Sequence, residues 1–305
     1  MGHFETVDGL LLLNKPAGLT SNQALQKVKR LLKAKKAGHT GSLDPAATGM
    51  LPLCFGEATK VCAFLLDADK TYRVTARLGV ATETGDADGA EIGMADVPAL
   101  DQDAWRKILQ SFLGDSTQIP PMYSALKKDG RRLYDLARKG EVVEREPRPI
   151  RIDEIELLEI AGNRLVFRVR CSKGTYIRTL VEDIAAKAGT VAHTARLHRE
   201  TVGAFKAADM LDLSGMEAVA ESGAEELRAR LLTPDMALEE LPAVILAETD
   251  GAKFLSGQEI LAPQETAEGL VRVYGTANEF FGVGLMSKGS RLAPKRVFKT
   301  SEKNS

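Results

Sequence analysis

The sequence predicts an α+β fold followed by a small β-rich domain. Segments with the period-two alternation of strands are interspersed with stretches that carry helical periodicity and capping signals. After Leu241-Pro242 the chain changes to short apolar runs punctuated by glycine, which is typical of a β-rich unit of roughly 60 residues. With 305 residues the chain can bury a large core, and we expect two domains, 1–241 and 242–305.

The first predicted elements are a strand and a capped helix. Residues 9–13, GLLLL, are apolar throughout, as in a buried strand, and NKPAG then forms a turn. Thr20 with Gln23 three residues later is a capping pair, and Leu25 and Val28 share one face of the helix that follows. The lysines of this helix therefore point mainly to solvent.

Further elements follow from periodicity. Residues 70–78 alternate with period two, which places Tyr72 on the inward face of a strand. Residues 101–113 have a helical pattern, and the sequence around 211–240 is helix-rich. Residues 164–171 alternate again and lead into SKGTYIRTLVEDIAAKAG, which predicts a turn and then a helix.

The formal net charge of −1 conceals a segregation of charge along the chain. Residues 81–103 carry seven acidic residues and no basic one, whereas 124–151 carry nine basic residues against five acidic ones. Two more basic groups are a run in and after the first helix and a C-terminal tail: Lys27, Lys29, Arg30, Lys33, Lys35 and Lys36; Lys288, Arg291, Lys295, Arg296 and Lys299. One such run is typical of a solvated face, but three together indicate an RNA or DNA partner.

Metal, disulfide and membrane classes find no support in the sequence. The three cysteines lack C-x-x-C spacing, and with the four histidines they form no zinc pattern. The acidic stretch TETGDADGAEIG places Ala95 where a calcium loop needs a glutamate. GLLLL is far too short to span a membrane. We expect a cytoplasmic protein in a reducing compartment, with no metal.

Residues 38–49, GHTGSLDPAATG, are the most unusual stretch. They lack the spacing of either glycine-rich phosphate loop, and Pro45 has no N–H to donate to a phosphate. The glycines and Asp44-Pro45 are turn formers. The residues alone leave two interpretations open, a turn in which Asp44 caps the backbone and a turn that presents a catalytic carboxylate.

Five blocks, in order across roughly residues 9–240, resemble the TruB family of bacterial synthases that make pseudouridine at position 55 of the tRNA T loop. They are LLLNKPAGLTS, GHTGSLDPAATGMLPLCFGEATK, KTYRVTARLG, QIPPMYSALKKDGRRLYDLARKG and GTYIRTLVEDI. The resemblance implies a pseudouridine-synthase catalytic domain on a mixed, largely antiparallel sheet, with an RNA-binding insertion at about 124–151. It also implies a PUA-like RNA-binding domain over 242–305.

The resemblance assigns chemistry to three residues. The reaction breaks the N1–C1′ bond of a uridine, turns the base and rejoins it through C5, without net redox change, so no cofactor is expected. Asp44 takes the place of the family nucleophile, and Arg178 that of the arginine that keeps it ionised. Tyr72 takes the place of the tyrosine that stacks on the base and accepts the C5 proton. The alternatives are a capping aspartate, a surface arginine and a core tyrosine.

The resemblance also implies four substrate-binding residues. His39 would fill space near the extruded nucleotide, and Tyr176 and Leu197 would line the pocket. Lys15 would support the wall of the site or contact a phosphate. The alternatives are a turn histidine, core packing for Tyr176 and Leu197, and a solvated lysine.

A stacked uridine has to be flipped out of its loop before it can react, at a cost of a few kcal/mol. Phosphate contacts from the basic helix and the basic segment 124–151 would offset that cost, and the segment would be a loop that orders on RNA binding. We therefore expect the tRNA T arm as partner, and a monomer without an obligate protein partner. The alternatives are a non-catalytic RNA-binding or RNA-folding protein and the catalytic subunit of a guide-RNA-directed pseudouridylase. An acylal at C1′ and a glycal intermediate also remain open.

Overall fold

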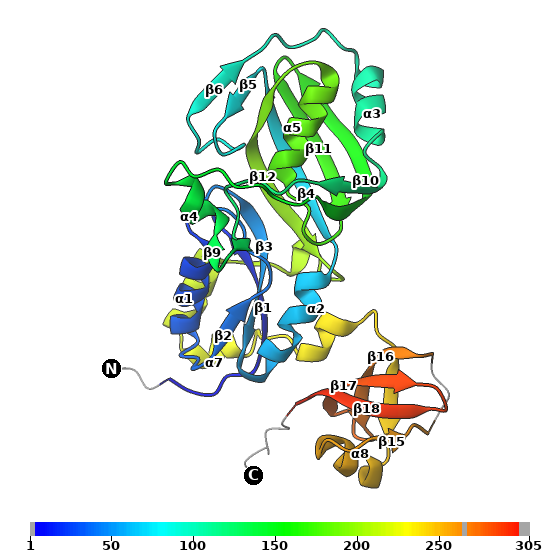
Figure 1. Cartoon of the computed structure of the whole chain (residues 1–305). Helices are drawn as coiled ribbons and strands as arrows, with labels where there is room; N and C mark the ends of the chain where they lie inside the picture. The colour runs from blue at the N-terminus through cyan, green and yellow to red at the C-terminus, as the bar shows by residue number, and fades with distance from the viewer. Residues whose placement is uncertain (1–3, 264–266, 299–305) are drawn as a thin grey trace.

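The computed structural model describes residues 4–263 and 267–298, which build two parts on separate sheets (Figure 1). The larger sheet has the order β13-β1-β3-β12-β4-β11-β10-β7, and β2 pairs with β3 beside this path. Its strands are β1 (Gly9–Lys15), β2 (Ala37–His39), β3 (Thr48–Phe55), β4 (Lys70–Leu78), β7 (Gly114–Gln118), β10 (Arg148–Ala161), β11 (Arg164–Cys171), β12 (Ala192–Val202) and β13 (Leu211–Asp212).

The pairing confirms the predicted mixed, largely antiparallel sheet. Only β1–β13 and β12–β3 are parallel among the pairs of this sheet in the described chain. Strand β12 pairs with β4 along most of its length and with β3 through His198 and Arg199. It therefore joins the two halves of the sheet, and Figure 1 shows β4 and β12 running between the upper and lower halves.

Helices cover both halves. In the lower half of Figure 1, α1 (Ser21–Leu31) packs its buried face against β1 and β3, together with α6 (Leu213–Glu221) and α7 (Ala224–Arg228). In the upper half, α3 (Gln102–Gln110) and α5 (Ile177–Ala188) pack on β4 and β11. The predicted capping pair is confirmed, because Thr20 Oγ1 accepts from the Gln23 backbone N–H at 3.1 Å. Within the described residues, no helix is both long and apolar enough to cross a lipid bilayer.

Short elements connect these layers. A 3₁₀ turn (Gly56–Val61) and α2 (Cys62–Asp67) link β3 to β4, and 3₁₀ turns also occupy Ala207–Asp209 and Pro234–Leu238. Strands β5 (Val80–Thr82) and β6 (Glu91–Met94) form a hairpin around the acidic stretch.

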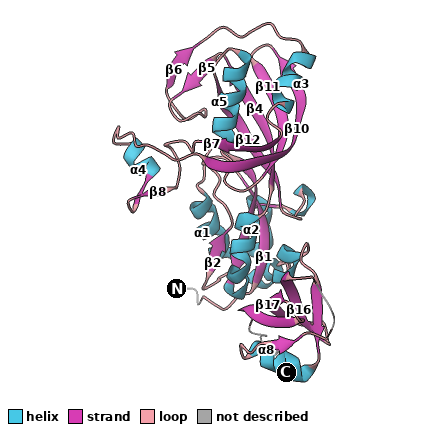
Figure 2. Ribbon diagram, turned by 45° about the vertical axis from the view of Figure 1, so that its right-hand side comes forward, coloured by secondary structure: helices cyan, strands magenta, loops and turns pink. Residues whose placement is uncertain are grey.

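The basic insertion forms an arm that protrudes from the sheet (Figure 2). It contains the hairpin of β8 (Lys127–Lys128) and β9 (Arg131–Arg132), followed by α4 (Leu133–Ala137). The leucines Leu133 and Leu136 of α4 are buried. The segment thus contains a hairpin and a short helix in this structure, since two apolar side chains one helical turn apart pack it onto itself. Its ordering on RNA binding stays a prediction.

The C-terminal part is β-rich, as the sequence predicts. Its sheet has the order β14-β16-β17-β18-β15 and encloses a core with α8. The elements are β14 (Ala243–Leu246), α8 (Glu248–Leu255), β15 (Ile260–Leu261), β16 (Gly269–Gly275), β17 (Phe280–Ser287) and β18 (Arg291–Val297). Lys299 of the predicted basic tail lies outside the described residues.

An apolar cluster fixes the small sheet to the large one. Val283 and Phe298 share a buried cluster with Leu10 and Leu12 of β1. Polar contacts add to it, because Tyr274 donates from its hydroxyl to Asp235 Oδ2 at 2.8 Å. The two parts thus share an apolar cluster and a hydrogen bond.

Gly49→Ala is expected to lower the free energy of unfolding by about 2 to 4 kcal/mol, through backbone strain and a clash. Gly49 has φ +100°, and an added Cβ would lie 2.3 Å from the Arg199 carbonyl oxygen, where β3 pairs with β12. Urea unfolding measures the loss. The matched control is Gly215→Ala in α6, where no atom lies within 4 Å of the added Cβ; it should stabilise by about 0.5 kcal/mol. Equal effects of the two substitutions would contradict the prediction.

Candidate active site

The loop between β2 and β3 holds Asp44 in a fixed turn. Ser21 at the start of α1 accepts from the Leu43 N–H at 2.8 Å and donates to the Leu43 carbonyl at 3.1 Å. The Gly18 N–H donates to the Pro45 carbonyl at 2.9 Å. The residues on both sides of Asp44 are thereby attached to the N-terminal end of α1, and the carboxylate itself remains 46% exposed.

Lys15 lies underneath this loop and is fully buried. Its Nζ donates to the carbonyls of Leu19, Pro16 and Pro45 at 2.7, 2.9 and 3.3 Å. Burial lowers the pKa of Lys15 to about 8, against the opposing effect of Asp44. The solvated-lysine interpretation is therefore wrong. Of the two roles expected for Lys15, these contacts fit support of the wall; a phosphate contact does not fit, since three carbonyls occupy the ammonium donors.

Arg178, at the start of α5, forms the expected ion pair with Asp44. Its Nε lies 3.2 Å from Asp44 Oδ2, and its Nη1 lies 3.6 Å from Asp86 Oδ2. The guanidinium also donates to the carbonyls of Thr84 and Tyr123, both at 2.7 Å. The side chain is 8% exposed, so the surface-arginine interpretation is wrong. Five-donor guanidinium geometry allows one side chain to hold two carboxylates and two carbonyls.

Two opposing influences act on Asp44. Burial raises the pKa of its carboxyl above the usual value, and the Arg178 guanidinium lowers it. Asp86 and Asp88 raise it again through like-charge repulsion. Arg178, and to a smaller extent Lys15, therefore favour the ionised form of the carboxylate beside an acidic hairpin.

Tyr72 lies on β4, directly opposite Arg199 of β12 and Val169 of β11. It is partly buried and packs against the same core cluster as Leu197. Burial raises the pKa of the Tyr72 phenol, Arg199 lowers it, and Asp44 raises it. Tyr72 and Asp44 therefore share one electrostatic environment.

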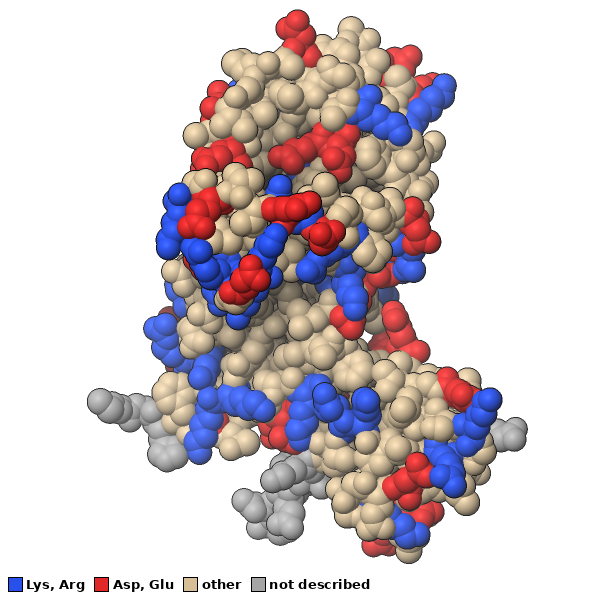
Figure 3. Space-filling model, in the orientation of Figure 1, with Lys and Arg blue, Asp and Glu red and all other residues tan. Residues whose placement is uncertain are grey.

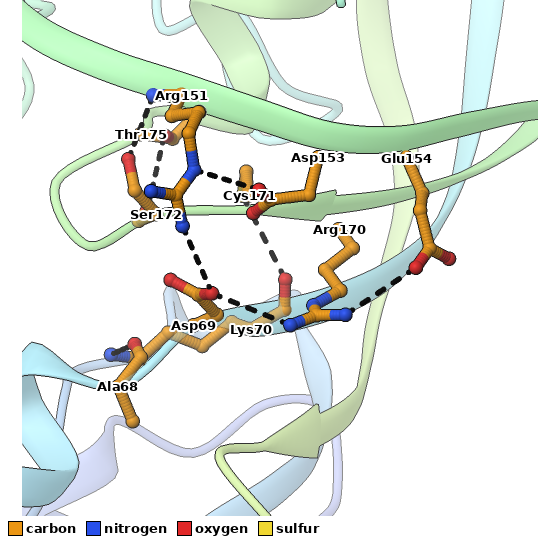
Figure 4. A network of polar contacts seen from close by, with 10 residues as sticks. All are labelled: Ala68, Asp69, Lys70, Arg151, Asp153, Glu154, Arg170, Cys171, Ser172 and Thr175. Atoms are coloured by element: carbon orange, nitrogen blue, oxygen red, sulfur yellow. Dashed lines mark hydrogen bonds and ion pairs between the residues drawn. The ribbon is translucent and has the colours of Figure 1, made fainter. Parts of the chain in front are cut away.

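Figure 4 shows how the first residues of β4 are held, two positions before Tyr72. Asp69 accepts ion pairs from Arg151 of β10 at 3.4 Å and Arg170 of β11 at 3.6 Å. Lys70 turns back and donates to carbonyls at the end of α2, including that of Leu66 at 2.7 Å. The strand that presents Tyr72 is thus tied to its neighbours at its beginning.

Tyr176 immediately precedes α5, and His39 ends β2. The backbone of Tyr176 is clamped by Gln118, whose Oε1 accepts from the Tyr176 N–H at 2.8 Å and whose Nε2 donates to its carbonyl at 3.1 Å. Burial raises the pKa of the Tyr176 phenol, and Asp44 is among the charges that act on it. The Nδ1 of His39 is buried without a hydrogen-bond partner in the described structure.

Comparison with known proteins identifies the chain. The family model "TruB family pseudouridylate synthase (N terminal domain)" matches residues 29–177, and two TruB C-terminal models match 178–239 and 242–298. The chain is 49% identical to the tRNA pseudouridine synthase B of Nitrosococcus oceani, over 96% of this chain and 95% of that one. The chain belongs to the TruB family. The synthase B of Stutzerimonas stutzeri is 50% identical, over 96% of both chains.

Solved structures share the fold of this TruB-family chain. One is a Cbf5-Nop10-Gar1 complex, with a TM-score of 0.75 and 26% identity over 96% of this chain and 86% of that one. Another is an H/ACA RNP bound to a substrate RNA containing 2′-deoxyuridine, with a TM-score of 0.74, 25% identity and the same coverage. The pseudouridine-synthase fold that the sequence predicts is confirmed.

Sequence reasoning missed three residues of this TruB-family site. Asp86 pairs with Arg178, but the acidic stretch around it carries no sequence signal for that role. Gln118 clamps Tyr176 from a strand without an apolar pattern. Arg199 is 1% exposed in the middle of β12. The sequence could have indicated Arg199, because it lies two residues after Leu197 and residues two apart in a strand point to the same face.

Among residues 4–263 and 267–298, no group of three or more His, Cys, Asp or Glu side chains is arranged to hold a metal ion. The polar groups of the site are instead an ion-paired carboxylate, two phenols and an unpartnered imidazole nitrogen. Such a set can supply a nucleophile, a cation that stabilises it, and a proton acceptor.

Proposed function

We propose that this chain isomerises a uridine in the T loop of tRNA, at position 55, to pseudouridine. The observation that carries the proposal is the Asp44–Arg178 ion pair, in which a half-exposed carboxylate is held by a buried guanidinium. Membership of the TruB family and the names of relatives about half identical in sequence support it.

In the proposed reaction, Asp44 enables cleavage of the N1–C1′ bond, either by attack at C1′ or by a route through a glycal. The uracil turns while bound, and C5 bonds to C1′ as any bond between Asp44 and C1′ breaks. Tyr72 in its phenolate form takes the C5 proton and later returns it to solvent, and N1, which carries no proton in uridine, gains one from solvent. Atoms and electrons balance within the nucleotide, so the proposal needs no cofactor. Arg178 keeps Asp44 ionised, and Tyr176, Leu197 and His39 surround the base.

Base flipping requires contacts that hold the RNA. The arm lines an open cavity of about 580 Å³ with Lys127, Gly130, Arg131, Arg132, Asp135, Arg138 and Lys139. Figure 3 shows Lys and Arg side chains gathered over this arm. Exposed lysines of α1 and its C-terminal extension provide a second basic surface. These side chains suit backbone phosphates, which fix position but carry little sequence information. Residues 242–298 are proposed as a second RNA-binding unit.

The test uses the purified full chain and unmodified tRNA, without guide RNA or other proteins, followed by pseudouridine mapping. Pseudouridine at position 55 is the expected result, from a monomer. RNA binding without pseudouridine would instead favour a non-catalytic RNA-binding or RNA-folding protein. Activity that appears only with a guide RNA and partner proteins would favour a subunit of a guided pseudouridylase.

A further inference from the structure

Arg199 is a buried cation without a carboxylate partner. It is 1% exposed, and no ion pair involves it in the part of the chain that the structure describes. Its neighbours include other basic groups, because its charge helps to lower the pKa values of Lys15, Lys70 and His39. A buried charge that lacks an opposite charge is costly to keep, so its contacts need a specific explanation.

The guanidinium of Arg199 joins two segments of the active site. Its Nε donates to the Met50 carbonyl of β3 at 2.7 Å, and its Nη2 donates to the Gly41 carbonyl at 3.0 Å. Gly41 lies three residues before Asp44, in the loop that presents the carboxylate. Arg199 therefore connects β12 and β3 with the loop of the proposed nucleophile.

Arg199 also lies beside Tyr72 in the sheet. The two residues are direct partners in the antiparallel register of β12 and β4, where side chains of paired residues lie on the same face. The positive charge of Arg199 lowers the pKa of the Tyr72 phenol. The other charged or titratable groups that act on this phenol are Cys171 of β11 and Asp44 of the loop, and neither is a cation.

We propose that Arg199 is a positioning residue that acts through the Tyr72 hydroxyl and fixes this phenol relative to the loop that carries Asp44. The inference rests on the proposed function. Two effects are proposed. The cation beside Tyr72 stabilises its phenolate form, which is the form that can accept a proton. The hydrogen bonds to Gly41 and Met50 fix the distance between Tyr72, the proposed base, and Asp44, the proposed nucleophile.

A double-mutant cycle in single-turnover assays tests the proposal. Arg199→Gln is expected to slow pseudouridine formation on the order of 10²-fold, with the Kd for tRNA unchanged within about twofold. In a Tyr72→Phe background the same substitution should cost no more than about threefold, because the group through which it acts is gone. Arg199→Lys keeps the positive charge but loses the planar set of N–H donors, so its rate should lie between those of wild type and Arg199→Gln. Equal losses in both backgrounds would overturn the proposal.

A second readout does not depend on activity. Fluorotyrosine incorporated at position 72 reports its own ionisation by fluorine NMR, and Arg199→Gln should move its apparent pKa upward. The matched control is Arg168→Gln on neighbouring β11, an exposed arginine paired with Glu200, which should leave the titration in place. An unchanged pKa of the fluorotyrosine at position 72 in Arg199→Gln would contradict the proposal. If Arg199→Gln does not fold, Arg199→Lys takes its place in both the double-mutant cycle and the fluorine NMR titration.

Failure of the proposed function gives a different pattern. If wild type makes no pseudouridine on tRNA while Arg199→Gln still shifts the fluorotyrosine titration, the function is wrong and the Arg199–Tyr72 coupling stands. If wild type is active and neither the cycle nor the titration responds, the function stands and the role of Arg199 is wrong.

Discussion

Asp44→Asn is expected to abolish pseudouridine formation, with a loss on the order of 10⁴-fold or more in single turnover. The substitution keeps the size of the side chain but removes its charge and nucleophilicity. The loop should remain in place, because its hydrogen bonds run through Ser21, Leu43 and Pro45 and not through the carboxylate. Affinity for tRNA should therefore stay within about twofold of wild type, since phosphate contacts dominate binding.

The control for this substitution is Asp103→Asn, which removes a carboxylate that is 77% exposed on α3. It should leave the rate unchanged. An Asp44→Asn variant that keeps a tenth of the wild-type rate would contradict a nucleophilic role and favour the capping interpretation of this turn. A variant that loses tRNA affinity in parallel with its rate would show that Asp44 acts in binding.

Much of the fold follows from local patterns. The strands with alternating side chains, β4 and β11, have the bounds that the sequence predicts, and α1 begins at its capping pair. Three long strands of the sheet, β3, β10 and β12, are not predicted by the sequence patterns. In β3 nearly every residue is buried, so no alternation is visible, and Pro52 argues against a strand. In β12 the buried positions include His193, Thr194 and Arg199, which read as polar.

The same limit applies to the site. The pairing of Asp44 with Arg178 was available from motifs in two distant blocks. Asp86 and Arg199 were not, because their roles arise from tertiary placement: Asp86 comes near Arg178 only through the β5–β6 hairpin, and Arg199 meets Tyr72 only through strand register. Charge patterning assigns acidic stretches and isolated arginines to the surface. It is wrong for residues such as Asp86 and Arg199, which the tertiary fold brings into the site.

Arg178→Gln is expected to slow pseudouridine formation roughly 10²- to 10⁴-fold near neutral pH and to displace the acid side of the pH–rate profile. Burial, Asp86 and Asp88 all raise the pKa of Asp44, and Arg178 is the largest influence that lowers it. Without the guanidinium this pKa rises further. Asp44 has to be ionised to react, so the variant should lose activity at a higher pH than wild type as the pH falls. Single-turnover rates across the acidic to neutral range measure the displacement.

A double variant separates loss of charge balance from loss of structure. Removing Asp86 as well, in Arg178→Gln/Asp86→Asn, takes away a like charge that raises the pKa of Asp44. The acid limb should then move part of the way back toward wild type. A purely structural role of Arg178 predicts the opposite, because its hydrogen bonds to Thr84 and Tyr123 stay lost and the second substitution adds damage. An acid limb identical in wild type and Arg178→Gln would show that this arginine does not control the ionisation of Asp44.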